Sequence, residues 1–355
     1  MKLDPGFLDR RPEEGARLVA LSLCEKAERA AVEIGGPEDA EALHDFRVAL
    51  RRLRTTIDGY DPCLAGIGRR RSARRLKKLA RATNPARDAQ VQLEWLGRHG
   101  PKLRARHQGA VAWLSARLER RREEAEDEAR SELAPRFRRF AARLRGRLER
   151  FEGQLGDGGP QPVFAEAMAG ALREGARSLR ERMAAVSGAD EERPIHKARI
   201  AAKRLRYLLE PLRGHPRVDA EQAVAGLKEL QDLLGGLHDL HVLAGVVSEA
   251  LREAAVELSE RLHARVYAGE GGLEGLKGEL RRNLRPGLLA IDRLVRRERD
   301  VLFERLGREW LAGGLDRLEA AVEELSGALE GGRRDAGREA APPETAPRGA
   351  GAPPA

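Results

Sequence analysis

The 355-residue chain is poor in aromatic residues and contains no long apolar run. Aromatic side chains are 4% of the total, too few for a β-sandwich or barrel, whose strands need aromatic and β-branched residues. No stretch of about 18 apolar residues is present, so no membrane span is expected. Cys24 and Cys63 are the only cysteines, too few for a disulfide framework. Because the N-terminus also has no apolar signal core, we expect a reduced, cytoplasmic protein.

Charged residues, in contrast, are abundant and make up 35% of the chain. The 66 basic residues outnumber the 57 acidic ones, which gives a net charge of +9. Only nine of the basic residues are lysine, and a genome rich in G and C would produce that bias through its codons alone. The placement of the charges is therefore better evidence of function than their number.

The spacing of the apolar residues predicts an all-α fold. Leu, Ala and Val recur every three or four residues, and Pro and Gly punctuate the pattern. The expected helices cover residues 12–34, 37–60, 69 to a break at 83–85, 101–132, 135–155, 162–186, 194–212, 218–234, 237–268 and, less regularly, the stretch to 330. Residues 153–162 are rich in Gly and Pro and are expected to form a linker. Residues 331–355 hold five Pro and five Gly and are expected to be a disordered tail.

An internal repeat is the most informative feature of the sequence. Residues 44–54 align without a gap on residues 196–206, and six of the eleven positions are identical. A second block, residues 77–91, aligns on residues 228–242 at nearly the same offset. Two blocks in the same order indicate a duplicated helical unit. We therefore predict a first repeat over 1–155, a second repeat over 160–330 and the tail over 331–355.

Both copies of the first block carry a row of basic side chains beside an apolar row. At about 100° of rotation per residue, the basic row of each copy spans roughly 80° of its helix. In the first copy it contains His44, Arg47, Arg51 and Arg54; in the second, His196, Arg199, Lys203 and Arg206. Arg52 and Arg204 point elsewhere on the helix and are weaker candidates. Such a row is usually a solvated face, but its preservation in two copies of one chain favours a ligand.

The helix expected from residue 69 is more strongly basic. Residues 62–87 contain nine cations and no anion. Four of the cations share one face of the helix: Arg70, Arg74, Lys77 and Arg81. Like charges on one face cost a few tenths of a kcal/mol per adjacent pair on an isolated helix. The compensating anion must come from another helix, from solvent or from a ligand.

Basic rows from both halves that face one another would enclose a positively charged groove or channel. A guanidinium group matches phosphate oxygens with two parallel hydrogen bonds, and a helical row offers one cation per turn of about 5.4 Å. His44 and His196 would add charge as the pH falls through the 6s. The ligand that this arrangement describes is a linear polyanion with closely spaced phosphates.

These motifs resemble the CHAD family, the conserved histidine α-helical domain. The resemblance covers about residues 13–330 and lies in His44-x-x-Arg47-x-x-x-Arg51-Arg52-x-Arg54, in its copy over 196–206, in Asn84-Pro85-Ala86-Arg87-Asp88 and in Leu234-Gly235-Gly236-Leu237-His238-Asp239. It implies two tandem antiparallel helical bundles related by pseudo-twofold symmetry, with basic residues lining a central channel. It also implies binding of inorganic polyphosphate and a location at polyphosphate granules.

The rows and the resemblance together give the candidate polyphosphate-binding residues. They are His44, Arg47, Arg51, Arg52, Arg54, Arg70, Arg74, Lys77, Arg81, Arg87, His196, Arg199, Lys203, Arg204, Arg206, Lys228 and His238. The second copy has His238 where the family has arginine, and Glu229 and Asp232 lie near Lys228. We therefore expect the C-terminal half to bind more weakly.

We expect neither a catalytic site nor a cofactor. The acidic run over 123–128 is interleaved with arginine and reads as a solvated helix face. His238 and His241 lack a third metal ligand, and the Gly-rich segment at 156–159 lacks the lysine and the preceding strand of a phosphate loop. The expected activity is therefore binding and not catalysis.

Two other functions stay open at this point. Nucleic-acid binding is consistent with the net positive charge, although aromatic residues rarely accompany the basic rows. A helical scaffold that reaches granules through a protein partner is the other alternative, and in that case the basic rows are simply solvated. The sequence makes no prediction of the oligomeric state.

Overall fold

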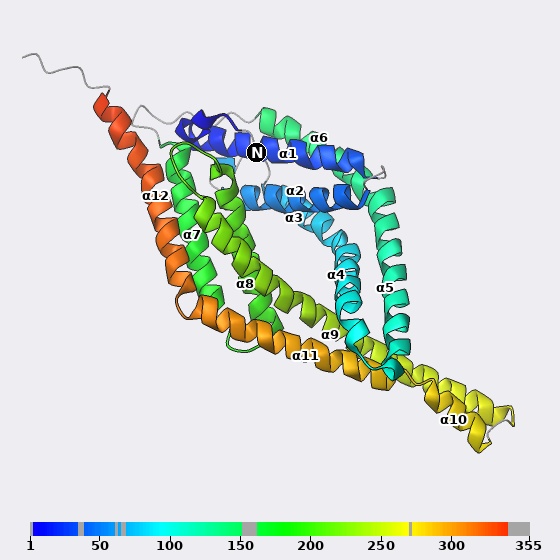
Figure 1. Cartoon of the computed structure of the whole chain (residues 1–355). Helices are drawn as coiled ribbons and strands as arrows, with labels where there is room; N and C mark the ends of the chain where they lie inside the picture. Colours follow the sequence, from blue (N-terminus) through cyan, green and yellow to red (C-terminus); the bar gives the residue numbers. More distant parts are fainter. Residues whose placement is uncertain are drawn as a thin grey trace, which may run out of the picture.

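The computed structural model describes residues 3–34, 39–60, 63–64, 69–150, 162–269 and 272–339. Throughout these ranges every regular element is a helix, which confirms the all-α fold (Figure 1). Residues 151–161, which contain most of the expected linker, lie outside them.

The helices before the linker form the first part of the fold. They are η1 (Pro5–Asp9), α1 (Pro12–Glu33), α2 (Asp39–Gly59), α3 (Arg69–Ala82), α4 (Asn84–His99), η3 (Gly100–Lys102), η4 (Ala105–His107), α5 (Gln108–Glu128), the π-helical turn η5 (Ala129–Leu133) and α6 (Ala134–Glu149). The helices after it are α7 (Phe164–Ala184), α8 (Glu192–Leu209), η6 (Glu210–Leu212), α9 (Glu221–Tyr267), α10 (Leu273–Arg281), α11 (Arg285–Leu306), the π-helical turn η7 (Gly307–Leu311) and α12 (Gly314–Glu339).

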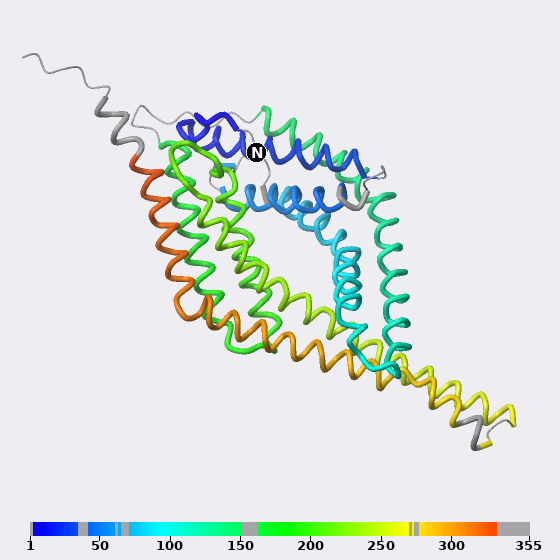
Figure 2. The backbone as a smooth tube through the Cα atoms, in the orientation of Figure 1, coloured from blue at the N-terminus to red at the C-terminus, as the bar shows by residue number. Residues whose placement is uncertain are grey.

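Helices from the two parts are interleaved in space. α1 packs against α2 and α6, and it also contacts α7 from the second part. α4 and α5 form a pair that reaches α9 and α11, as the tube view shows (Figure 2). α10 packs on α9 and projects with it away from the other helices (Figure 1).

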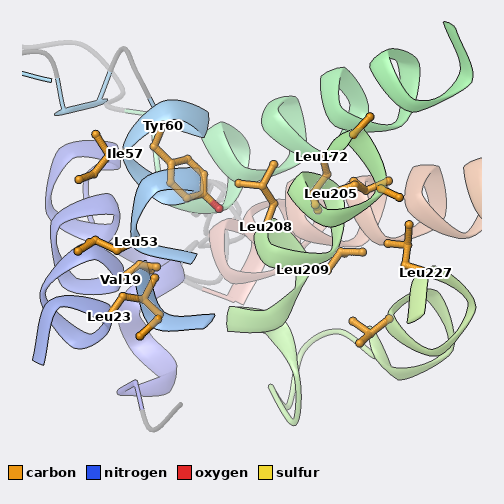
Figure 3. Close-up of a cluster of buried hydrophobic side chains, with 14 of the residues drawn as sticks. Val19, Leu23, Leu53, Ile57, Tyr60, Leu172, Leu205, Leu208, Leu209 and Leu227 are labelled. Carbon is orange, nitrogen blue, oxygen red and sulfur yellow. The ribbon is translucent and has the colours of Figure 1, made fainter. Parts of the chain in front are cut away.

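The hydrophobic core joins both parts of the chain. Its larger cluster combines Leu23 and Ile57 from α1 and α2 with Leu172, Leu205 and Leu227 from α7, α8 and α9 (Figure 3). A second cluster joins α4 and α5 to α9 and α11. Each of these helices turns an apolar face to the core and leaves its basic face for another environment. The division at residues 155–160 remains a prediction, as does the internal duplication.

The break expected in α9 at Gly235-Gly236 is absent. The helix runs without interruption over 47 residues. A Cβ atom on Gly236 would lie 2.9 Å from Leu302 Cδ1, and one on Gly235 would lie 3.8 Å from Arg199 Nε. These glycines therefore allow α11 and α8 to approach α9 closely, and they do not end the helix. Each glycine makes the helix less stable than alanine would, by about 1 kcal/mol.

Other expected boundaries also differ from the structure; α6, for example, ends at Glu149 and not near residue 155. The segment at 83–85 ends α3 but also starts α4, because Pro85 occupies the first turn of α4. Backbone N–H groups in the first turn have no partner within the helix, so the missing N–H of proline costs no hydrogen bond there. The helix expected from residue 101 begins only at Gln108, after η3 and η4. α12 continues to Glu339, so its last residues fall inside the segment expected to be a tail. Residues 340–355 lie outside the described ranges.

Gly15 marks a tight contact between α1 and α7. A Cβ atom there would lie 2.3 Å from Cγ of Phe164, which is fully buried. Because the added methyl group would overpack this contact, we expect Gly15→Ala to lower the free energy of unfolding by about 1–3 kcal/mol in urea denaturation. Gly170→Ala in α7 is the matched control, since nothing lies within 4 Å of its Cβ position. It should stabilise by about 0.5–1 kcal/mol. Equal free energies of unfolding for the Gly15→Ala and wild-type proteins would contradict a tight contact between Gly15 and Phe164.

Candidate functional site

Charged side chains from four helices gather where α2 and α4 face α8 and α9. We call this set the central cluster: Arg47 and Arg51 of α2, Arg87 and Asp88 of α4, Arg199 and Lys203 of α8, and His238 and Asp239 of α9. The contacts of α2 with α8, and of α4 with α9, bring these sequence-distant residues together. The cluster contains five cations and two carboxylates.

The α2 side of the central cluster is formed by two arginines one turn apart. Arg47 is only 6% exposed, and its buried Nε has no hydrogen-bond partner. Burial, followed by the charges of Arg51 and Arg87, lowers the pKa of Arg47 to about 10. Arg51 donates a hydrogen bond to Asn84 Oδ1 at the start of α4, over 3.3 Å. This bond ties the α2 row to the helix that carries Arg87.

The α8 side mirrors that arrangement with Arg199 and Lys203. Arg199 lies 3.9 Å from Asp239, while its buried Nε has no partner. Burial, followed by the charges of Arg199 and Arg51, lowers the pKa of Lys203 to about 6, while Asp239 acts in the opposite direction. The Lys203 amine is therefore mostly neutral at pH 7 in the free protein. α2 packs against α8, and the charge of Arg51 lowers the pKa of both α8 residues, so the basic rows of α2 and α8 face the same space.

The histidines of the site favour the neutral form. The rings of His196 and His238 lie 4.6 Å apart between centroids, at an angle of 42°. Burial, followed by the charge of Arg199, lowers the pKa of His238 to about 3. Burial and neighbouring arginines also lower the pKa of His196 and of the exposed His44. His44 and His196 therefore take up a proton at a lower pH than a free imidazole does.

Two carboxylates inside the cluster were not predicted as site residues. Burial raises the pKa of both Asp88 and Asp239, and the Asp239 charge raises that of Asp88 further. Their arginine neighbours act in the opposite direction. A signal was present in the sequence, because Asp88 and Asp239 occupy matching positions of the second repeated block. Even with Lys203 neutral, two carboxylates neutralise only part of the charge of the four arginines in the cluster.

Four predicted arginines, two from each copy of the first block, lie outside the central cluster. Three of them have a carboxylate partner, and the fourth is exposed. Arg52 donates to Glu210 Oε1 over 2.9 Å, and Arg54 lies 3.5 Å from Asp58. Arg206 lies 3.8 Å from Glu210 and stacks over Tyr207. Arg204 is exposed and lines a separate pocket together with Asp58. The helical rotation had already placed Arg52 and Arg204 away from the basic rows.

The remaining predicted cations lie on other surfaces. Lys77 and Arg81 are exposed on α3, and Lys228 is exposed on α9. None of these three makes an ion pair with a residue that the structure describes. Arg74 is exposed on α3, and the side chain of Arg70 lies outside the described residues. The three described cations of this α3 face, Arg74, Lys77 and Arg81, are thus exposed and are not counted in the central cluster.

Two further features of the described ranges bear on the class of site. No set of three or more His, Cys, Asp or Glu side chains within them is arranged to hold a metal ion. His241 is buried, and its Nδ1 lies 2.8 Å from the Leu237 carbonyl oxygen one turn earlier. Over the same ranges, no helix is both long and apolar enough to cross a membrane.

Comparison with known proteins identifies the family. The family model described as "CHAD domain" matches residues 20–248, more than half of the chain. The crystal structure of the CHAD domain from the plant Ricinus communis is similar, with a TM-score of 0.53 and 24% sequence identity. That match covers 82% of this chain and 94% of the plant chain, and it supports the fold. A search of curated proteins gave no match. The chain belongs to the CHAD domain family.

Proposed function

We propose that the protein binds inorganic polyphosphate through the central cluster, without catalysis. The observation that carries this proposal is the packing of α2 against α8, which brings Arg51 close enough to Arg199 and Lys203 for its charge to lower the pKa of both. Because residues about 150 positions apart line one space, a single linear anion can meet both basic rows. The four arginines of the cluster outnumber its two carboxylates even with Lys203 neutral, which makes an anionic ligand the natural complement.

The unfilled hydrogen-bonding capacity of the cluster supports a phosphate ligand. The Nε atoms of Arg47 and Arg199 are buried without an acceptor. A buried donor without a partner costs about 1–3 kcal/mol, so an acceptor supplied by a ligand stabilises the site. Phosphate oxygens are strong acceptors that match the planar guanidinium group. A phosphate chain would therefore satisfy both the charge and the hydrogen bonds of these two arginines.

The surroundings of Tyr207 favour polyphosphate over nucleic acid. Binders of single strands stack bases on exposed aromatic rings. Tyr207 follows the α8 basic row, but it is buried, and the guanidinium groups of Arg52 and Arg206 lie over its ring at 5.9 and 5.3 Å. Its face is therefore unavailable to a base.

Competition between two polyanions tests this proposal. We expect long-chain polyphosphate to displace labelled single-stranded DNA at a phosphate concentration at least tenfold lower than that needed for the reverse displacement. The affinity should also fall steeply with salt, with a logarithmic slope of about −3 to −4 if all five cations of the cluster meet phosphate. The measurement is fluorescence anisotropy from 50 to 300 mM salt. Equal competition per phosphate, or a flat salt response, would contradict the proposal.

The absence of catalysis and the location at granules are parts of the same proposal. Incubation of the protein with polyphosphate should leave the chain-length distribution unchanged on a gel. Labelled protein should gather at polyphosphate granules in cells, and it should lose that location when the central cluster is disabled. If the disabled protein still reaches the granules, a scaffold recruited by a protein partner explains the location better.

A further inference from the structure

A second basic groove lies between α3 and α6, away from the central cluster. Its cavity measures about 460 Å³. Arg75 and Lys78 of α3 line one wall, and Arg136, Arg139 and Arg143 of α6 line the other. All five side chains are exposed. The groove therefore brings together two helices whose facing side chains have the same charge.

The groove uses a different face of α3 from the basic face noted in the sequence. At about 100° per residue, the face of Arg75 and Lys78 lies about 120° from that of Lys77 and Arg81. On α6, Arg136, Arg139 and Arg143 repeat at three- and four-residue spacing, so they also share one face. Each wall is thus a continuous row of cations along its helix.

The chain itself supplies little negative charge to the groove. Glu128, at the end of α5, is the carboxylate among the lining residues. Arg136 lies 2.8 Å from Glu132 of η5. Within the described ranges, Arg75, Lys78, Arg139 and Arg143 make no ion pair. Four cations are therefore left facing one opening without a carboxylate partner.

The floor of the groove strengthens the field of these cations. Leu79, Leu133 and Phe140 form it, and each is less than 10% exposed because each also belongs to the large hydrophobic core. Apolar walls of low polarisability focus the field of the charges around them into the opening. On an isolated surface helix, water would solvate each cation separately. Here the cations of two helices surround one cavity.

We propose that this groove is a second anion site, which binds a compact ligand carrying several phosphates, such as a nucleoside triphosphate or a short inorganic phosphate chain. The cavity volume lies within the range of about 300–1,000 Å³ that small-molecule sites occupy. Two phosphates would each bridge an α3 cation and an α6 arginine, which removes the repulsion between the walls. The apolar side chains that line the floor offer contact to a base or sugar. This site is separate from the proposed polyphosphate site.

Titration of matched variants tests this inference. The groove variant combines Lys78→Gln, Arg139→Gln and Arg143→Gln. The control variant removes three exposed cations elsewhere on α5 and α6, through Arg120→Gln, Arg121→Gln and Arg138→Gln. ATP and inorganic tripolyphosphate, without divalent metal, are titrated into each full-length protein by calorimetry at 50 mM salt. Circular dichroism checks that each variant is folded.

We expect the groove variant to lose at least tenfold in affinity for both probes, and the control variant to stay within twofold of the wild type. Tighter binding of ATP than of tripolyphosphate would show that the nucleoside contacts the floor, and equal binding would show that the phosphates alone are recognised. If the groove and control variants lose affinity equally, or if neither loses any, the inference is wrong.

The same titrations separate the groove from the central cluster. They are repeated in a protein carrying Arg51→Gln and Lys203→Gln, whose central cluster is weakened. The groove should still bind both compact probes in that protein, and addition of the groove substitutions should abolish that binding. Long-chain polyphosphate binding reports on the central cluster separately. The experiments therefore show separately whether the groove proposal fails and whether the polyphosphate proposal fails.

Discussion

Replacement of Arg51 and Lys203 together by glutamine is expected to weaken binding of long-chain polyphosphate at least 100-fold at 50 mM salt. Arg51 and Lys203 lie on different helices but in the same cluster, so the double variant removes a cation from each basic row. A hydrogen bond to a charged group contributes about 1.5–3 kcal/mol, and two of them exceed the 2.7 kcal/mol that a 100-fold change in affinity requires. Fluorescence anisotropy with end-labelled polyphosphate measures the effect.

The residues next in sequence provide a matched control for this variant. Arg52→Gln combined with Arg204→Gln removes the same number of basic side chains, one position further along each helix. Arg52 pairs with Glu210, and Arg204 is exposed, so neither faces the cluster. The affinity of the control should stay within about threefold of the wild type. A similar loss in both double variants would mean that the overall charge, and not the cluster, binds the ligand.

Polyphosphate binding is expected to tighten as the pH falls from 8.5 to 6.5. The pKa of Lys203 is lowered to about 6 in the free protein, so its amine is mostly neutral across this range. A bound polyanion favours the charged amine and raises its pKa, so binding takes up a proton. The affinity should therefore increase by up to tenfold per pH unit, or about 10- to 100-fold over the range. At lower pH, protonation of His238 and of the two carboxylates, whose pKa values are raised by burial, makes the cluster more positive and continues the trend in the same direction.

The substitution Lys203→Arg isolates the contribution of this amine. Arginine keeps a charge at the position throughout the range, because its pKa is far above neutral. We expect the affinity of this variant to change by less than about threefold between pH 6.5 and 8.5. Calorimetry in buffers of different ionisation enthalpy should show proton uptake on binding by the wild type and much less uptake by the variant. Equal pH slopes for the two proteins would show that Lys203 does not take up the proton.

Most of the helices could be predicted from sequence because their apolar spacing is regular. The predicted ends of α1 and α2 agree with the structure within about a residue. The error at Gly235-Gly236 has a tertiary cause, since both glycines serve contacts with Leu302 and Arg199, which local propensity does not encode. No helix was predicted where α4 lies, because Pro85 was interpreted as a stop, although proline also fits the first turn of a helix.

The candidate site was predictable in part. Helical rotation alone separated Arg51 from Arg52 and Lys203 from Arg204, and the structure separates them in the same way. The interpretation of α3 was less complete, because sequence analysis identified one basic face and could not reveal that α6 presents a second basic row to a neighbouring face. The roles of Asp88 and Asp239 required the structure, since their interaction depends on how α4 meets α9.

A crystal structure of the protein with a medium-length polyphosphate tests the central claim most directly. The proposal predicts one continuous chain of phosphates, with oxygens within hydrogen-bond distance of Arg47 or Arg51 at one point and of Arg199 or Lys203 at another. A phosphate chain bound only on exposed surfaces, with the central cluster unoccupied and Arg199 still beside Asp239, would contradict it.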